Sequence, residues 1–126
     1  MSRRMTAAEL KATRAYLGYQ LRELAEYLDT PLSAARDWER ERYLPPPEVT
    51  ERVRELVALT DEAVAYLTRH YETHTAEWPI ELPKSEADCE WVYPDVRRPV
   101  GASLGWWRMV IARVAHNIPD AGVDWT

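Results

Sequence analysis

The chain has 126 residues, of which 46% are hydrophobic and 29% are charged, and its formal net charge is −5 at pH 7. This composition fits one compact domain, or a small module with an accessory half, and it excludes an intrinsically disordered chain. Cys89 is the single cysteine, which excludes an intrachain disulfide. The sequence has no apolar run of about 18 residues and no apolar segment after Arg3 and Arg4. We therefore expect a cytoplasmic protein with neither a membrane span nor a signal peptide.

The charge is distributed unevenly along the chain. Residues 1–44 carry eight basic and seven acidic side chains, a net charge of +1, whereas residues 45–126 carry eight basic and fourteen acidic ones, a net charge of −6. Because binding to phosphate requires Lys and Arg, we expect any contact with nucleic acid to lie in the first part. The acidic second part is expected to face away from such a partner.

Two helices are predicted at the start of the chain. Thr6 and Glu9 have the spacing of a capping box, which predicts a helix that begins there and runs to about Leu17, with Gly18 at its end. Apolar residues at helical spacing predict a second, short helix over about Leu21–Leu28.

A third and a fourth helix are predicted next. Thr30 is the expected N-cap and Pro31 the expected first residue of the third helix, which ends by Arg42, ahead of three consecutive prolines. The fourth helix is long, from Glu48 to about His74, because apolar residues recur along it on one stripe at about 100° per residue.

The remaining segments are shorter. Residues 75–83 contain two prolines and are interpreted as a linker or a short edge strand through Ile80 and Leu82. A short helix is predicted over 85–91, a loop over 95–101, and a last helix from Ser103 to Asn117.

The last helix has apolar residues on two sides. Its broad apolar face leaves Trp106 and Met109 on the opposite side, among polar residues, and an exposed patch of that kind favours association. We therefore predict a homodimer built by the C-terminal part, with an interface that contains Trp106, Trp107, Met109 and Val110. The alternative explanation of the six Trp and seven Tyr is a Trp-rich core.

These elements predict a mainly α protein. An N-terminal helix-turn-helix bundle with its long connecting helix is predicted for residues 5–74, and a small, mostly helical dimerisation domain, with room for one or two short strands, for residues 75–126. Two short helices joined by a tight turn are the motif that places its second helix in the major groove of DNA.

Local details sharpen this motif. Leu17-Gly18, Leu24-Ala25 and Trp38-Glu39 resemble the phage-repressor type of helix-turn-helix. The resemblance implies that Trp38 packs under the recognition helix and that Glu39 forms an ion pair with Arg14 of the first helix. We also expect an inward face made of Leu24, Ala25, Leu28 and Trp38.

The sequence departs from that superfamily in places. Gln20-Leu21 stands where many members have Thr-Gln, so the phosphate contact would come from Gln20 or Arg22. Asp29 and Glu41 stand at two positions where the superfamily commonly has glycine.

A wider resemblance covers nearly the whole chain. Residues 5–10, Trp38-Glu39, the long helix and the segment 105–108 together look like the YdiL-like family, which includes the anti-CRISPR-associated repressors. This resemblance implies an N-terminal DNA-binding half, a C-terminal half that dimerises, and autoregulatory transcriptional repression at an inverted repeat in double-stranded DNA.

The third helix supplies most of the predicted DNA contacts. Arg36 is the expected base reader, because its planar guanidinium matches the two acceptors of guanine, whereas Arg40 and Arg42 are expected near the backbone. The full predicted set is Gln20, Arg22, Thr30, Leu32, Ser33, Arg36, Asp37, Arg40 and Arg42.

Other chemistries have weaker signals. His70 and His74 have the spacing of half a metal site, to which Cys89 or His116 could add ligands, but they lack the zinc-protease pattern. Because His74 falls on the apolar stripe, a hydrogen-bonded core histidine is the favoured explanation. No catalytic motif or phosphate-binding glycine loop is found, so we expect no enzyme, no metal and no cofactor. The remaining alternative is a protein-interaction module, such as an antitoxin whose acidic half binds a partner protein.

Overall fold

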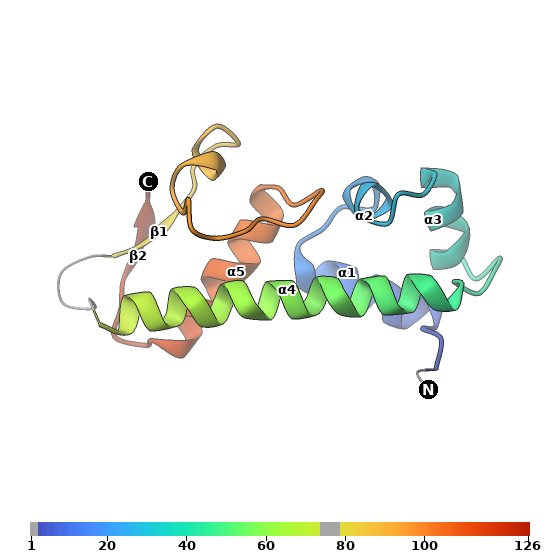
Figure 1. Cartoon of the computed structure of the whole chain (residues 1–126), viewed down its shortest axis with the longest axis horizontal. Helices are drawn as coiled ribbons and strands as arrows, with labels where there is room; N and C mark the ends of the chain where they lie inside the picture. Colours follow the sequence, from blue (N-terminus) through green and yellow to red (C-terminus); the bar gives the residue numbers. More distant parts are fainter. Residues whose placement is uncertain (1–2, 74–78) are drawn as a thin grey trace.

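The computed structural model of the chain describes residues 3–73 and 79–126, and in these residues it is mainly helical with a small parallel sheet (Figure 1). None of the described helices is long and apolar enough to cross a membrane. The elements are α1 (Ala7–Leu17), α2 (Leu21–Tyr27), α3 (Leu32–Glu39), α4 (Pro47–Glu72), β1 (Ile80–Leu82), the 3-10 helix η1 (Asp88–Glu90), α5 (Leu104–Asn117) and β2 (Val123–Trp125).

The capping box predicted at the start of α1 is confirmed. The Thr6 hydroxyl accepts from the Glu9 amide at 3.1 Å, and the Glu9 carboxylate accepts from the Thr6 amide at 3.2 Å. The Arg3 guanidinium also donates to Glu9, and this hydrogen bond lowers the pKa of the Glu9 carboxyl to about 2. At the other end, Gly18 terminates the helix in the left-handed region, with a φ of 70°.

The turn from α2 to α3 differs from the prediction by one residue. The Pro31 carbonyl accepts the first hydrogen bonds of α3, from Ala34 and Ala35, so Pro31 is the N-cap and not the first helical residue. The helix ends at Glu39, earlier than predicted, because Glu41 has a φ of 64°, which a right-handed helix does not allow.

Helix α4 runs along the length of the molecule and packs against α5 (Figure 1). It begins with Pro47 in the first turn, where the missing amide is not needed. Its 26 residues span about 39 Å at 1.5 Å per residue. The apolar stripe predicted from the sequence is buried, and it includes Val53, Leu56, Val64, Leu67 and Tyr71.

The prediction that Trp106 lies on an outer face of the last helix is wrong. Helix α5 is covered on two sides by its own chain, because it packs on α4, on α1 and on β1. Trp106 is fully buried and donates its indole N–H to the Thr60 hydroxyl of α4 at 3.0 Å. Trp107 and Val110 are fully buried as well, so these three residues offer no surface for the predicted dimer interface. Met109 is half-buried.

The small sheet joins two distant segments in parallel. Ile80 pairs with Val123, Glu81 with Asp124 and Leu82 with Trp125. The sequence predicted a short strand through Ile80 and Leu82, which is confirmed, but not the specific strand β2. The side of β1 away from β2 is closed by side chains, since the Glu81 amide donates to the Tyr71 hydroxyl and the Glu81 carbonyl accepts from Tyr93.

Close backbone contacts join the N-terminal helices to the C-terminal segment. A Cβ on Gly18 would lie 2.2 Å from the carbonyl oxygen of Gly105, and one on Gly101, which has a φ of 81°, would lie 2.4 Å from that of Glu23. The Tyr19 hydroxyl, whose pKa burial raises, donates to the Val100 carbonyl at 2.7 Å. The two predicted parts therefore share one hydrophobic core.

Candidate functional site

Helices α2 and α3 form a hairpin whose inner face is apolar. Leu24, Ala25, Leu28 and Trp38 are all less than 9% exposed, which confirms the inward face expected from the sequence. Trp38 lies in the last turn of α3, so its burial holds that end of the helix against the core. Helix α3 contacts both α1 and α2. Its opposite face therefore points outward.

An ion pair ties α3 to α1, as the sequence predicted. Two guanidinium nitrogens of Arg14 donate to the two carboxylate oxygens of Glu39, at 2.7 and 3.1 Å. A third donates to the Tyr19 carbonyl at 3.0 Å. The side chains are 20% exposed for Arg14 and 7% exposed for Glu39. Because a bidentate guanidinium–carboxylate pair requires a specific relative geometry, this pair fixes the orientation of α3 relative to α1.

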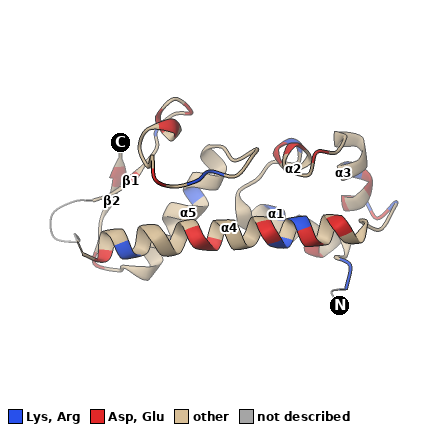
Figure 2. Cartoon of the chain, viewed as in Figure 1, with Lys and Arg blue, Asp and Glu red and all other residues tan. Residues whose placement is uncertain are grey.

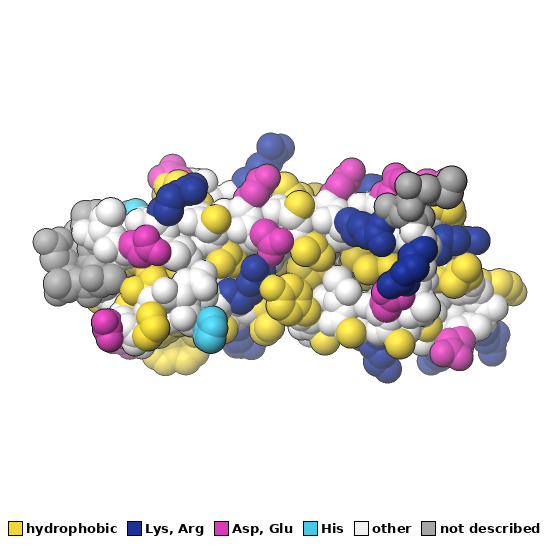
Figure 3. All heavy atoms as spheres, turned by 90° about the horizontal axis from the view of Figure 1, so that it is seen from below, with side chains coloured by type: hydrophobic (Ala, Val, Ile, Leu, Met, Phe, Trp, Pro, Cys, Tyr) yellow, Lys and Arg dark blue, Asp and Glu magenta, His cyan; other side chains and the backbone are white. Residues whose placement is uncertain are grey.

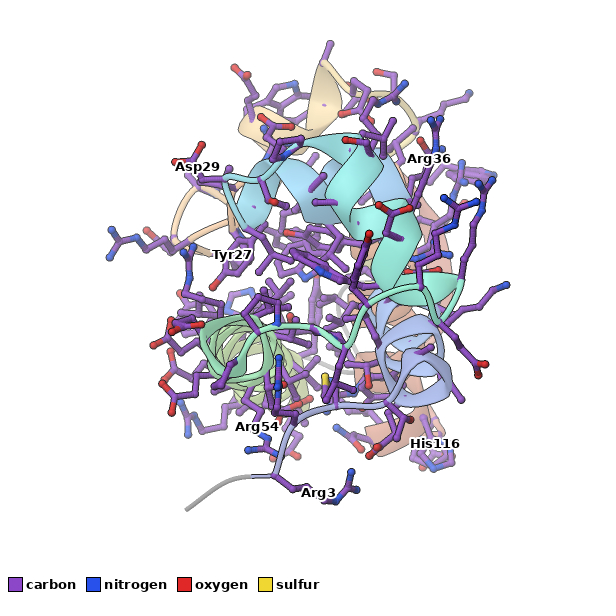
Figure 4. All side chains as sticks on the ribbon, turned by 90° about the vertical axis from the view of Figure 1, so that its right-hand side faces the viewer. Arg3, Tyr27, Asp29, Arg36, Arg54 and His116 are labelled. Atoms are coloured by element: carbon purple, nitrogen blue, oxygen red, sulfur yellow. The ribbon has the colours of Figure 1, made fainter. Side chains whose placement is uncertain are left out.

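The outward face of α3 carries exposed polar and basic side chains. Ser33, Arg36, Arg40 and Arg42 are exposed, and Leu32, Asp37 and Thr30 are half-buried around them. Figure 4 shows Arg36 on one side of the molecule, opposite to Tyr27 and Asp29. The predicted contact residues of α3 thus lie together on one free surface.

Two further predicted contacts lie at the start of α2. Gln20 and Arg22 are exposed, and the Arg22 guanidinium donates to the Gln20 side-chain oxygen at 3.2 Å. The Gln20 backbone N–H donates to the Glu23 carboxylate at 2.7 Å, as part of a capping box at the start of α2. These two polar side chains are paired with each other at the N-terminal end of α2.

The backbone at Asp29 and Glu41 has an unusual conformation. Their φ angles are 52° and 64°, in the left-handed region that favours glycine. At both positions the phage-repressor type of helix-turn-helix commonly has glycine. Both turns around α3 therefore take a glycine-like conformation although the residues are acidic, at a cost of about 1 kcal/mol each.

The surface charge is uneven. Figure 2 shows acidic and basic residues alternating along α4, whereas α5 contains three basic side chains and no Asp or Glu. On the face seen in Figure 3, more Lys and Arg side chains gather at the end of the molecule that holds the N-terminal helices. On this face the basic side chains are therefore more numerous at the N-terminal end of the molecule.

The other predicted chemistries find little support among the described residues. His74 lies outside them, and no group of three or more His, Cys, Asp or Glu there could hold a metal ion. Cys89 is buried, and burial raises the pKa of its thiol, which makes it less reactive. A cavity of about 350 Å³ lies beside β1, but its two tyrosine hydroxyls, from Tyr71 and Tyr93, bond to each other at 2.9 Å and to the Glu81 backbone.

One contact had no signal in the sequence. Arg113 of α5 donates to the Asp61 carboxylate of α4 at 2.8 Å, and its guanidinium lies 5.2 Å from the centre of the Tyr16 ring of α1. The partners are 52 and 97 positions apart in the chain, so no local spacing could have indicated this three-helix junction.

No protein-family model matches the chain, and no curated protein matches its sequence. The interpretation of the site therefore depends on its own geometry and charge.

Proposed function

We propose that the chain is a sequence-specific DNA-binding transcriptional regulator whose α2–α3 hairpin is a helix-turn-helix. The observation that carries this proposal is the way α3 is fixed to the core on one side and exposed on the other. Trp38 and the Arg14–Glu39 ion pair hold its inner side, while Ser33 and Arg36 project from its outer side. A helix held in this way can enter the major groove with its N-terminal half foremost.

The residues of α3 fit distinct roles in this proposal. Arg36 donates two hydrogen bonds to the O6 and N7 atoms of a guanine. Ser33 bonds to a base or a phosphate, and Leu32 contacts a thymine methyl group. Asp37, which phosphate repels, accepts from a cytosine amine or orients Arg36. Arg40, like Arg42, bonds to the phosphate backbone.

Thr30, Gln20 and Arg22 complete the backbone contacts at the edge of the groove. The Gln20–Arg22 pair lies at the N-terminus of α2, where backbone amides favour a phosphate. These contacts position the protein on the duplex and carry no base specificity.

We further propose that the regulator acts as a homodimer at an inverted repeat, as a repressor of its own operon. With three of the predicted interface residues buried in the core, strand β2 is the surface that suits a second copy. Val123 and Trp125 are 46% and 54% exposed, and no strand among the described residues pairs with the side of β2 away from β1. Pairing of two such edges around a two-fold axis presents two copies of α3 to the two halves of an inverted repeat. Because β2 and α3 lie at opposite ends of the molecule (Figure 1), the two half-sites are separated by more than one helical turn of DNA.

The test of DNA recognition compares two arginines of α3. Operator variants that differ at single positions are titrated with the wild type, Arg36→Ala and Arg40→Ala in a gel-shift series. Arg36→Ala should cost about 1–3 kcal/mol per half-site and relax the preference at one base pair, whereas Arg40→Ala should weaken all variants alike. Unchanged affinity and preference for Arg36→Ala would show that α3 is not the recognition helix.

Light scattering tests the homodimer. The wild type should give the mass of a dimer at micromolar concentration, and Val123→Pro, which removes a backbone donor from the strand edge, should give that of a monomer. A monomeric wild type would contradict the two-half-site proposal.

A further inference from the structure

Helix α1 lies between α3 and α5. On one side, Arg14 of α1 forms the ion pair with Glu39 of α3. On the other side, the Tyr16 ring lies under the Arg113 guanidinium of α5, and the backbone at Gly18 touches that at Gly105. The three helices are therefore in direct contact in the order α3, α1, α5, and each leaves an outer face exposed.

The outer face of α5 is basic. Arg108, Ala112 and His116 are exposed and follow one another at intervals of four residues, so they form one stripe along the helix. Helix α5 contains no acidic residue. In the neighbouring helix α1, the acidic residue is Glu9, which is paired with Arg3. The Arg108 guanidinium therefore has no carboxylate on its own helix to neutralise it.

His116, at one end of this stripe, lies on the same side of the molecule as Arg36 of α3. In Figure 4, Arg36 lies in the upper part and His116 in the lower part of that side, whereas Tyr27 and Asp29 lie on the opposite side. Arg54 of α4 lies near the bottom of the same view, to the left of Arg36. A straight duplex placed against α3 on that side would thus pass the face of the molecule that carries the α5 stripe.

We infer that Arg108 and His116 of α5 form a second contact with DNA, in which they bind phosphates of the same duplex that α3 recognises. The inference rests on the proposed function. The Arg108 guanidinium offers a fork of N–H donors that matches a phosphate, and the His116 imidazole offers an N–H donor. Eight residues separate the two along α5, a distance of about 12 Å.

The inference corrects the expectation that the whole second part of the chain faces away from nucleic acid. The net charge of −6 for residues 45–126 is an average over several elements. Its acidic residues lie outside α5, for instance on α4, whose first half carries Glu48, Glu51 and Glu55. A single basic helix face is therefore compatible with an acidic segment.

Salt dependence gives the first test. The affinity for a duplex selected from a random pool is measured at several salt concentrations, because each phosphate contact contributes about 0.9 to the slope of log K against log salt. Arg108→Ala should lower the slope by about 0.9 per bound protomer, so that between 50 and 200 mM salt it loses about 3.5-fold less affinity than the wild type does. Arg54→Ala, which removes the same charge from the other side, is the matched control and should keep the wild-type slope.

Directed cleavage gives the second test, which reports position and not charge. The single cysteine is buried, so an iron chelate can be attached selectively to an exposed cysteine introduced between Arg108 and His116. The Ala112→Cys protein should cleave the duplex beside the base pairs contacted by α3. The Ala65→Cys protein, labelled on the exposed surface of α4, should cleave it only at background level.

The outcomes separate this inference from the proposed function. If the wild type and its Arg36→Ala variant behave as proposed, while Arg108→Ala keeps the full salt slope and Ala112→Cys gives no local cleavage, then α3 recognises DNA and the α5 contact does not exist. If the wild type binds no duplex from the pool, both proposals are wrong. Reduced slope together with local cleavage at Ala112→Cys supports the second contact.

Discussion

Glu39→Ala isolates the ion pair on which the mounting of α3 depends. The Glu39 side chain is only 7% exposed and the Arg14 side chain 20% exposed, so both are largely shielded from solvent. After the substitution, the hydrogen bond that remains to the Arg14 guanidinium, among those between described residues, is the one to the Tyr19 carbonyl. An exposed pair contributes about 0–1 kcal/mol, and breaking a buried one costs about 3–5 kcal/mol. For this intermediate burial we expect the free energy of unfolding to fall by about 2–3 kcal/mol.

Urea denaturation followed by tryptophan fluorescence measures this loss. The control is Glu55→Ala, because Glu55 pairs with Arg52 at 3.8 Å on the surface. This substitution should change the free energy of unfolding by no more than about 0.5 kcal/mol. The double variant Arg14→Ala/Glu39→Ala should lose less than the sum of the two single variants, since the second substitution removes no further pair. A Glu39→Ala protein as stable as Glu55→Ala would refute the argument that this pair holds α3.

Three further predictions concern the frame around the site. Gly18→Ala should lower the melting temperature markedly, because the Cβ meets backbone at 2.2 Å and φ is positive, whereas Gly122→Ala, with nothing within 4 Å, should not. Thr60→Val removes the acceptor of a buried indole N–H and should cost about 1–3 kcal/mol in urea denaturation. The pKa of Glu9, held at about 2 by the hydrogen bond from Arg3, is lower than in the unfolded chain. The stabilisation it gives is complete above pH 4.5 and lost as the pH falls towards 2, so the stability advantage over Glu9→Gln, followed by thermal melts, should shrink in that range.

Local signals in the sequence predicted the N-terminal helices well. The capping pair Thr6 and Glu9 and the terminating Gly18 act within a few residues of each other, so they can be recognised without knowledge of the fold. The start of α3 was predicted one residue too early, with Thr30 and not Pro31 as the N-cap. The choice between them depends on which carbonyl accepts the first helical bond.

Long-range packing could not be predicted in the same way. Helical periodicity placed Trp106 opposite to the main apolar face, but it does not show that α4 covers this side and offers the Thr60 hydroxyl. Strand β2 is three exposed residues, and its partner Ile80 is 43 positions away from Val123, so it has no local pattern. The Arg14–Glu39 pair is also long-range, and only the resemblance to a known motif indicated it.

Selection of binding sites from a random pool of duplex DNA tests the central claim most directly. The wild-type protein is taken through repeated rounds of binding and sequencing, in parallel with Arg36→Ala. The account predicts that the wild type enriches an inverted repeat whose half-sites are more than one helical turn apart, and that Arg36→Ala loses the preference at one guanine in each half-site. A wild-type pool that remains random after selection would contradict sequence-specific recognition by α3.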